Sequence, residues 1–128
     1  EYDEKLIAFF TEFRKQHPDI GHGIISNSLK DQVDITLDIL KLPREWFSHI
    51  ISSTEWGFPK PDIRCYQKMI EVAGQQPAHI LYVGDREQAD VVPAKKAGMK
   101  TARITSGDSV ADIVIREPYD LLDALARR

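Results

Sequence analysis

The stretch HILYVGDREQAD, residues 79–90, decides the fold. Its first half is the most apolar strand-like run of the chain and ends on Gly84, and two aspartates, Asp85 and Asp90, follow it. A buried strand that stops on carboxylates is typical of a parallel sheet, in which ligands collect at the carboxyl ends of the strands. The stretch therefore predicts an α/β fold with a site at one edge of the sheet.

Strand-like and helical segments alternate on both sides of this stretch. Short apolar runs predict further strands at residues 22–27, 49–52, 100–104 and 111–115. The apolar stripe from Leu6 to Phe13 predicts a first helix that ends near His17 and Pro18. Further helices are predicted after an N-cap at Ser28, over Ile63–Ala73, over Asp90–Ala97 and after Pro118, with a loop at residues 53–62. This order predicts a three-layer, Rossmann-like parallel sheet with helices on both faces.

Composition limits the class of protein. With 128 residues, 42% hydrophobic and 29% charged, the chain has the bulk of one globular domain, which we expect to span residues 1–128. A net charge of −3 gives no extended basic field, so we expect no nucleic-acid partner and no binding to an anionic membrane. The single Cys65 cannot form an internal disulfide and fits a reducing compartment, which favours the cytoplasm.

Three segments carry a resemblance to a known family. GIISNS (residues 23–28), GFPKPD (57–62) and YVGDREQADVVPAKKAGM (82–99) are similar to the second, third and fourth motifs of the haloacid dehalogenase (HAD) superfamily of phosphohydrolases. The match spans nearly the whole chain. It implies a Mg²⁺-dependent phosphomonoesterase that acts on a small phosphorylated metabolite through an aspartyl-phosphate intermediate.

The resemblance also implies roles in binding the phosphoryl group, whose charge must be neutralised and held in line. Ser26 would donate a hydrogen bond to a phosphoryl oxygen, assisted by backbone N–H groups around Asn27 and Ser28. Lys60 would stabilise the phosphoryl charge, which makes Ser26 and Lys60 the expected catalytic residues. The alternatives are a helix-entry serine that makes only local bonds and a solvated loop lysine.

By the same resemblance, Asp85 and Asp90 would form the metal site. Asp85 follows a buried strand and would ligate Mg²⁺, which takes oxygen ligands and keeps several waters. Asp90 would bind the metal or its water shell, or hold Lys60, and the plainer alternative is an N-cap for the next helix. Arg86 departs from the motif, which usually has a small or hydroxyl residue there, and we expect it to point to solvent.

The first motif of the family is missing from the sequence. That motif is a strand ending in Asp-x-Asp, whose first aspartate attacks phosphorus, and no such pair occurs in these 128 residues. In the family this strand lies between the strands expected here at 22–26 and 79–83. We therefore expect a C-terminal core portion, completed by a preceding segment or another chain, that alone neither hydrolyses phosphate esters nor holds Mg²⁺ tightly.

Two other functions remain open. A degenerate, non-catalytic HAD-like scaffold would explain the absent Asp-x-Asp, although Ser26, Lys60, Asp85 and Asp90 together argue against it. A metal-free 2-haloacid dehalogenase would use the same fold, but halide displacement does not need the metal ligand that Asp85 supplies.

Overall fold

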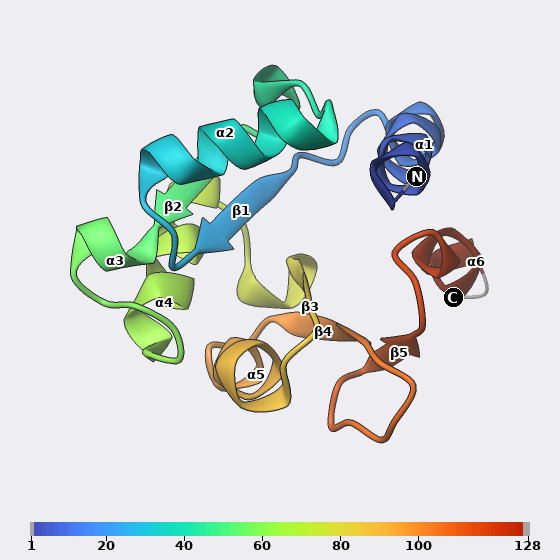
Figure 1. The fold of residues 1–128 in the computed structure, drawn as a ribbon. Helices are drawn as coiled ribbons and strands as arrows, with labels where there is room; N and C mark the ends of the chain where they lie inside the picture. Colours follow the sequence, from blue (N-terminus) through green and yellow to red (C-terminus); the bar gives the residue numbers. More distant parts are fainter. Residues whose placement is uncertain (1, 127–128) are drawn as a thin grey trace.

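The computed structural model describes residues 2–126, and side chains from residue 4 onward, as alternating helices and strands (Figure 1). The helices are α1 (Tyr2–Gln16), α2 (Lys30–Leu40), α3 (Ser53–Trp56), α4 (Ile63–Ala73), α5 (Val92–Lys96) and α6 (Asp120–Ala126). The strands are β1 (Gly23–Ser26), β2 (His49–Ser52), β3 (Leu81–Gly84), β4 (Lys100–Ile104) and β5 (Ile113–Ile115). Single helical turns are η1 (Arg44–Trp46), η2 (Pro77–His79) and the π-helical η3 (Glu87–Val91). The predicted α/β class is confirmed.

The strands form two parallel sheets. β1 pairs with β2, with Ser26 opposite Ser52, and the second sheet has the order β3–β4–β5, with Gly84 opposite Arg103. Within residues 2–126, β1 has no partner strand other than β2, and β3 none other than β4. β1 and β3 are therefore both edge strands of their sheets.

Helices α4 and α5 join the two sheets on one face. Ile25 of β1 and Ile51 of β2 share a buried cluster with Tyr66 of α4 and Ala94 of α5. Tyr82 of β3 packs against the same cluster, so apolar burial connects the sheets although no strand pairing does.

Helix α1 has the same bridging role on the other face. Phe9 and Phe13 are buried with Ile115 of β5 and residues of α6, whereas Phe10 also packs against a cluster that contains Leu37 of α2. Alternation along the strands explains the two faces, because successive strand residues point to opposite sides. Helices thus cover both faces, as expected.

Three local expectations are wrong. Ser28 does not cap α2, which begins after Leu29 with no side-chain cap, because Ser28 lies one residue too early and its N–H donates to Ser26 Oγ. Residues 53–62 are not all loop, since α3 occupies the first four. The helix expected from Asp90 starts earlier, at Glu87, because a π-helical turn precedes α5.

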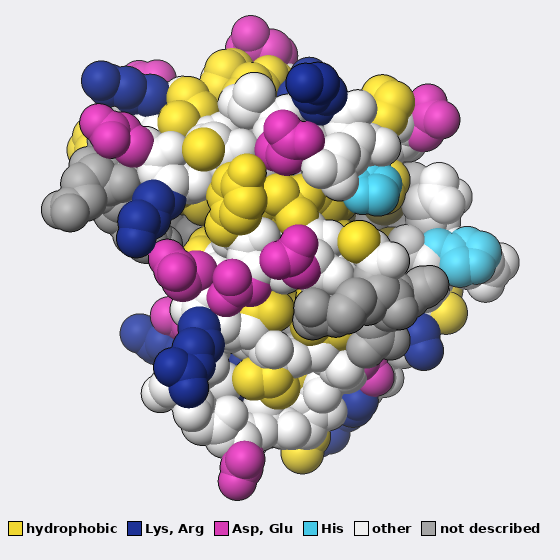
Figure 2. Space-filling view, turned by 90° about the vertical axis from the view of Figure 1, so that its right-hand side faces the viewer, with side chains coloured by type: hydrophobic (Ala, Val, Ile, Leu, Met, Phe, Trp, Pro, Cys, Tyr) yellow, Lys and Arg dark blue, Asp and Glu magenta, His cyan; other side chains and the backbone are white. Residues whose placement is uncertain are grey.

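The surface over α1 and α6 mixes charges of both signs. Figure 2 shows acidic and basic side chains interspersed around hydrophobic ones, without a continuous basic stripe on this face. No helix among the described residues has the length and apolar character that a membrane span requires.

Candidate functional site

An ion pair links the ends of the two sheets. Lys60 lies in the loop between α3 and α4, and Asp90 lies in η3, after β3. Lys60 Nζ is 2.8 Å from Asp90 Oδ1, and the two side chains are only 17% and 5% exposed. The structure thus brings two of the expected site residues into direct contact in a partly desolvated position.

The Asn27 side chain holds the backbone of the lysine loop. Its Oδ1 accepts a hydrogen bond from Lys60 N at 2.8 Å, and its Nδ2 donates to Lys60 O at 3.3 Å. Oδ1 also accepts from the Ser53 hydroxyl. Asn27 was expected to act through its backbone, whereas its side chain fixes Lys60 relative to the end of β1.

The other end of the lysine loop is fixed by Asp62. Asp62 is the N-cap of α4, and its Oδ1 accepts from Arg64 N at 2.9 Å. Hydrogen bonds from the Arg64 side chain and backbone lower the pKa of Asp62 to about 2. The loop that carries Lys60 is therefore anchored on both sides.

Three consecutive hydroxyl residues orient the chain that follows β1. Ser52 Oγ donates to Ser28 O at 2.7 Å and Thr54 Oγ1 to Asn27 O at 2.7 Å. Ser53 Oγ shares its one proton between Asn27 Oδ1 and Ser26 O, the latter at 3.0 Å. In a trans peptide the N–H points away from the C=O of the same unit. With these carbonyls turned toward β2 and α3, the N–H groups that follow them point the other way.

The Ser26 hydroxyl acts as an acceptor in the structure and can still donate a hydrogen bond. Its Oγ accepts from Ser28 N at 3.1 Å, which is a local bond. A hydroxyl that accepts in this way still has one O–H to donate. Ser26 therefore makes the local bond of the plainer alternative without losing the capacity expected from the resemblance.

Both carboxylate oxygens of Asp90 are engaged by the protein. Oδ1 contacts Lys60 Nζ at 2.8 Å and accepts from Tyr82 OH at 3.4 Å, and Oδ2 accepts from Arg86 N at 3.1 Å. Asp90 thus lies inside η3 and does not cap α5, whose N-cap is Val91. Of the roles considered for Asp90, contact with Lys60 is the one the geometry displays.

Gly84 makes this placement of Asp90 sterically allowed. A Cβ atom on residue 84 would lie 2.6 Å from Asp90 Cβ, closer than two carbon atoms can approach. The glycine before Asp85 is therefore required by the close approach of the Asp90 side chain to the end of β3.

Two tyrosines, one buried and one partly buried, support the ion pair. Tyr66 is fully buried and its OH donates to Ala89 O at 2.7 Å, within the π-helical turn. Its ring packs edge-on against Tyr82 with centroids 5.1 Å apart, and Tyr82 OH lies 3.3 Å from Lys60 Nζ. Burial raises the pKa of both phenols, which keeps them protonated as hydrogen-bond donors.

Asp85 differs from Asp90 in every respect that concerns a metal. Its side chain is exposed, and no group in the described part of the chain donates a hydrogen bond to its carboxylate. Among the residues described, no three His, Cys, Asp or Glu side chains are grouped so that they could hold a metal ion. Mg²⁺ commonly uses one or two carboxylates with waters and phosphate oxygens, so Asp85 fits such a site as one ligand of an incomplete set.

Two nearby residues contribute little chemistry. Cys65 is fully buried, and burial raises the pKa of its thiol to about 11, so it does not supply a thiolate nucleophile. The Arg86 side chain is exposed, as expected, and its backbone N–H is the group that reaches Asp90.

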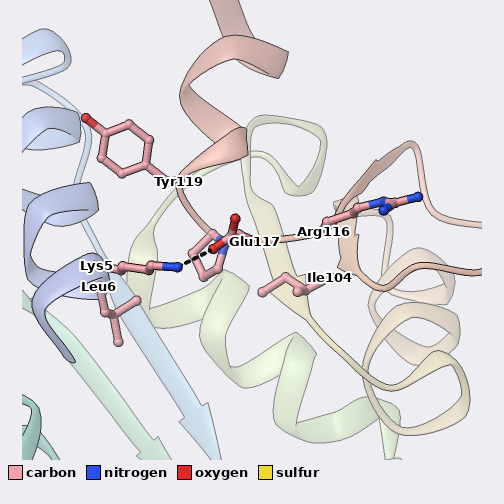
Figure 3. Close-up of a pocket in the computed structure, with 7 residues that line it drawn as sticks. Lys5, Leu6, Ile104, Arg116, Glu117 and Tyr119 are labelled. Atoms are coloured by element: carbon pink, nitrogen blue, oxygen red, sulfur yellow. Dashed lines mark hydrogen bonds and ion pairs between the residues drawn. The ribbon is translucent and has the colours of Figure 1, made fainter. Parts of the chain in front are cut away.

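A separate cavity lies between the start of α1 and the segment before α6. Its volume is about 350 Å³. Two of the residues that line it, Lys5 and Glu117, form an ion pair at 3.4 Å (Figure 3). None of the expected site residues lines it. The polar network at the ends of β1 and β3 is thus distinct from this cavity.

Sequence reasoning missed several supporting residues. Available signals were the hydroxyl run SST, which begins at the last residue of β2, and the tyrosines on otherwise apolar faces, since a buried tyrosine needs a partner for its OH. The missed residues are Ser52, Ser53, Thr54, Tyr66 and Tyr82.

Comparison with known proteins places these features in a family. Residues 6–104 match the family model described as haloacid dehalogenase-like hydrolase. Phosphoglycolate phosphatase of Aquifex aeolicus is 33% identical over 105 residues, which are 78% of this chain and 48% of that protein. Glyceraldehyde 3-phosphate phosphatase of Methanocaldococcus jannaschii is 33% identical over 85 residues, which are 61% of this chain and 37% of that protein. The chain spans less than half the length of these two relatives.

Solved structures share the fold. A HAD phosphatase from Thermococcus onnurineus has a TM-score of 0.76 at 26% identity, covering 98% of this chain and 64% of that one. L-2-haloacid dehalogenase from Xanthobacter autotrophicus has a TM-score of 0.78 at 19% identity, covering 91% of this chain and 59% of that one. The second similarity concerns the fold alone.

Proposed function

Because this chain belongs to the haloacid dehalogenase-like hydrolase family, we propose that it is the C-terminal core portion of a Mg²⁺-dependent phosphomonoesterase. The substrate would be a small phosphorylated metabolite, as the names of the phosphatase relatives suggest. The observation that carries the proposal is the network in which Asn27 and Asp90 hold Lys60 from two sides.

Lys60 would stabilise the charge of the transferred phosphoryl group. Asp90 and Tyr82 hold its ammonium group, and Asn27 fixes its backbone, so little reorganisation is needed when substrate binds. A fixed positive charge in a partly desolvated site stabilises developing negative charge more than a solvated one does. Lys60 is thus better suited to catalysis than a free loop lysine.

The segment after β1 would bind phosphoryl oxygens. Its carbonyls are turned away by Ser52, Ser53 and Thr54, and Ser26 retains an O–H to donate. Consecutive N–H groups that point to one side form an anion-binding concavity. Asn27 would therefore contribute to phosphate binding through its backbone N–H, and Ser28 would do so only after its N–H leaves Ser26 Oγ.

Asp85 would hold Mg²⁺, and Asp90 would act on it through the water shell. When bound, Mg²⁺ neutralises charge on the phosphoryl oxygens. Asp85 has an exposed carboxylate that no group of the described chain bonds, whereas Asp90 is committed to Lys60 and Arg86. Two carboxylates, one of them already paired, agree with weak metal binding by the chain alone.

The attacking carboxylate would come from a strand between β1 and β3. Both strands have an unpaired edge, and α1, α4 and α5 bridge the two sheets that they belong to. A parallel strand ending in Asp-x-Asp, from a preceding segment or from another chain, would satisfy both edges. It would place its carboxylates near the Lys60–Asp90 pair.

The other functions have weaker support. Similarity of fold to a haloacid dehalogenase at 19% identity does not carry over its activity, and the free Asp85 carboxylate favours a metal-using reaction. A non-catalytic scaffold would have no need for a lysine held at 2.8 Å from a carboxylate that is 5% exposed. We also propose a cytoplasmic location, because the single cysteine is free and buried.

The first experiment determines the intact mass and N-terminal sequence of the natural protein. If an Asp-x-Asp strand precedes Glu1, the complete polypeptide should release phosphate from small phosphomonoesters only with Mg²⁺. Lys60→Met should lower kcat by about 10²-fold or more, as removal of one charge-stabilising group does. The matched control is Lys96→Met, at an exposed lysine of α5.

Three results would contradict the proposal. Phosphate or Mg²⁺ binding without turnover by the complete protein would favour the scaffold. Chloride release from a 2-haloacid without Mg²⁺ would favour the dehalogenase. Mg²⁺-dependent turnover by the purified 128-residue chain, abolished by Asp85→Ala, would show that no added strand is needed.

A further inference from the structure

Arg103 is a charged residue near the end of strand β4, directly opposite Gly84 in the sheet. Its side chain is only 21% exposed. Its Nε donates to Asp85 O at 3.1 Å, and its Nη1 donates to Asp108 O at 3.2 Å. The guanidinium therefore bonds the backbone of the residue whose carboxylate would hold the metal.

Glu87 completes this contact from the other side. Its Oε1 lies 3.1 Å from Arg103 Nη1 and 2.6 Å from Ser109 Oγ, and its Oε2 accepts from Val110 N at 2.9 Å. Glu87 therefore bonds the Arg103 guanidinium and two groups of the segment after β4 at the same time. The segment after β3 is thus fastened to the segment after β4.

The arrangement suits a single exposed carboxylate. Across residues 2–126 no group bonds to the Asp85 side chain, so its direction depends on how its backbone is held. Loss of a partner that orients a metal ligand typically lowers the metal affinity by about 10-fold to 100-fold. Arg103 is the side chain that bonds the Asp85 peptide group.

We propose that Arg103, held by Glu87, is a positioning residue that fixes the main chain at Asp85 and thereby orients its carboxylate toward a divalent cation. The guanidinium is suited to this role because its planar fork donates in several fixed directions at once. Lysine at the same position could pair with Glu87 but could not also bond Asp85 O in the same geometry. The role in metal binding rests on the proposed function, whereas the restraint on the main chain does not.

The test compares Arg103→Gln and Arg103→Lys with the natural chain. The matched control is Arg116→Gln, at an exposed arginine that follows β5. Mn²⁺ is titrated to millimolar concentration, and paramagnetic broadening of backbone amide signals reports weak binding near residue 85. Hydrogen exchange of the amides of residues 85–88 is measured without metal.

We expect Arg103→Gln to weaken Mn²⁺ binding about 10-fold and Arg103→Lys to give an intermediate value, with Arg116→Gln unchanged. Amides of residues 85–88 should exchange faster in Arg103→Gln, while those of α4 keep their protection. The helical circular dichroism signal of each variant shows that it is folded.

The two levels of the proposal fail in different ways. If Asp85→Asn abolishes Mn²⁺ binding while Arg103→Gln leaves binding and exchange unchanged, the positioning role is wrong. If Asp85→Asn leaves Mn²⁺ binding unchanged, the metal site of the proposed function is wrong. Exchange at residues 85–88 then decides whether Arg103 restrains the main chain.

Discussion

The end of β1 and the end of β3 are held in place by different chemistry. After β1, most of the groups that hold the chain are neutral: the Asn27 amide and the hydroxyls of Ser52, Ser53 and Thr54. The Glu55 carboxylate adds one bond further along, from Lys30 N. After β3, charged side chains do it, through Lys60–Asp90 and Arg103–Glu87. Neutral hydrogen bonds depend little on pH and salt, whereas ion pairs depend on both.

The difference corresponds to what each end would bind. A segment that presents N–H groups to an anion is best oriented by uncharged partners, which add no competing charge. A segment that presents a carboxylate to a cation needs nearby charges to balance the acids it already contains. Lys60 connects the two strand ends. Its backbone is held by the neutral Asn27 amide, and its ammonium group pairs with the Asp90 carboxylate.

The largest effect is expected from removing the charge of Asp90. Asp90→Asn removes the charge partner of the partly buried Lys60 ammonium. Whichever way the amide is turned, its N–H₂ faces one of two donors, Lys60 Nζ or Arg86 N. Unfolding free energy should therefore fall by about 3 kcal/mol. Urea unfolding measures it. The control Glu71→Gln breaks an exposed pair with Lys68 and should cost about 0–0.5 kcal/mol. Equal costs for the two variants would remove the distinction between the charged end and an ordinary surface pair.

A steric change at the same strand end should cost somewhat less. Gly84→Ala places a Cβ at 2.6 Å from Asp90 Cβ and should destabilise the fold by about 2 kcal/mol, because the ion pair must shift. Gly107→Ala is the control, since its nearest contact would be 3.7 Å. Thermal unfolding compares the two, and a neutral Gly84→Ala would show that the Asp90 side chain has room to move.

At the neutral end the expected effect is smaller. Asn27→Ala removes two hydrogen bonds to the Lys60 backbone and one from Ser53, and should cost about 1–2 kcal/mol, unchanged by added salt. Asp90→Asn should respond to salt, because it changes a charge. Urea unfolding at low and high ionic strength tests this contrast, and a salt-dependent cost for Asn27→Ala would contradict it.

The smallest effect is expected for the contribution of Glu87 to stability at acid pH. Hydrogen bonds from Ser109 and Val110 and the charge of Arg103 lower the pKa of Glu87 below its ordinary value of 4.5. A depressed pKa contributes stability above the unfolded-state pKa and loses it as pH falls through the folded-state pKa. Glu87→Gln should therefore flatten the fall in stability between about pH 5 and pH 3, measured by thermal unfolding. Parallel pH profiles for the variant and the natural chain would exclude this contribution.

Much of the fold follows from local patterns. Strands at 49–52 and 100–104 are predicted to the residue, because β-branched runs there are bounded by clear turn signals. The π-helical turn at Glu87–Val91 is not predictable in this way, since it depends on Asp90 folding back to Arg86 N. Serine often caps helices, but Ser28 N donates to Ser26 Oγ and α2 begins only after Leu29.

The sequence likewise predicts one part of the candidate site and not another. The motifs predict which residues gather, and Lys60 and Asp90 do meet. The residues that hold this pair in place were not predicted. Asn27 bonds a residue 33 positions away in the sequence and Tyr66 one 23 positions away, and no local sequence pattern encodes such contacts. The separation of roles between Asp85 and Asp90 likewise depends on burial, which differs between them although both are aspartates in one motif.

The division of the strands into two sheets has a consequence for the order of folding. β1 and β2 are joined through α2, and β3, β4 and β5 follow one another, so each sheet closes from segments near in sequence. Contacts between the sheets join residues as distant as Ile25 and Ala94, and such long loops are closed late. A strand added between β1 and β3 would pair with both only after each half had formed, which makes it the final step of assembly and not its nucleus.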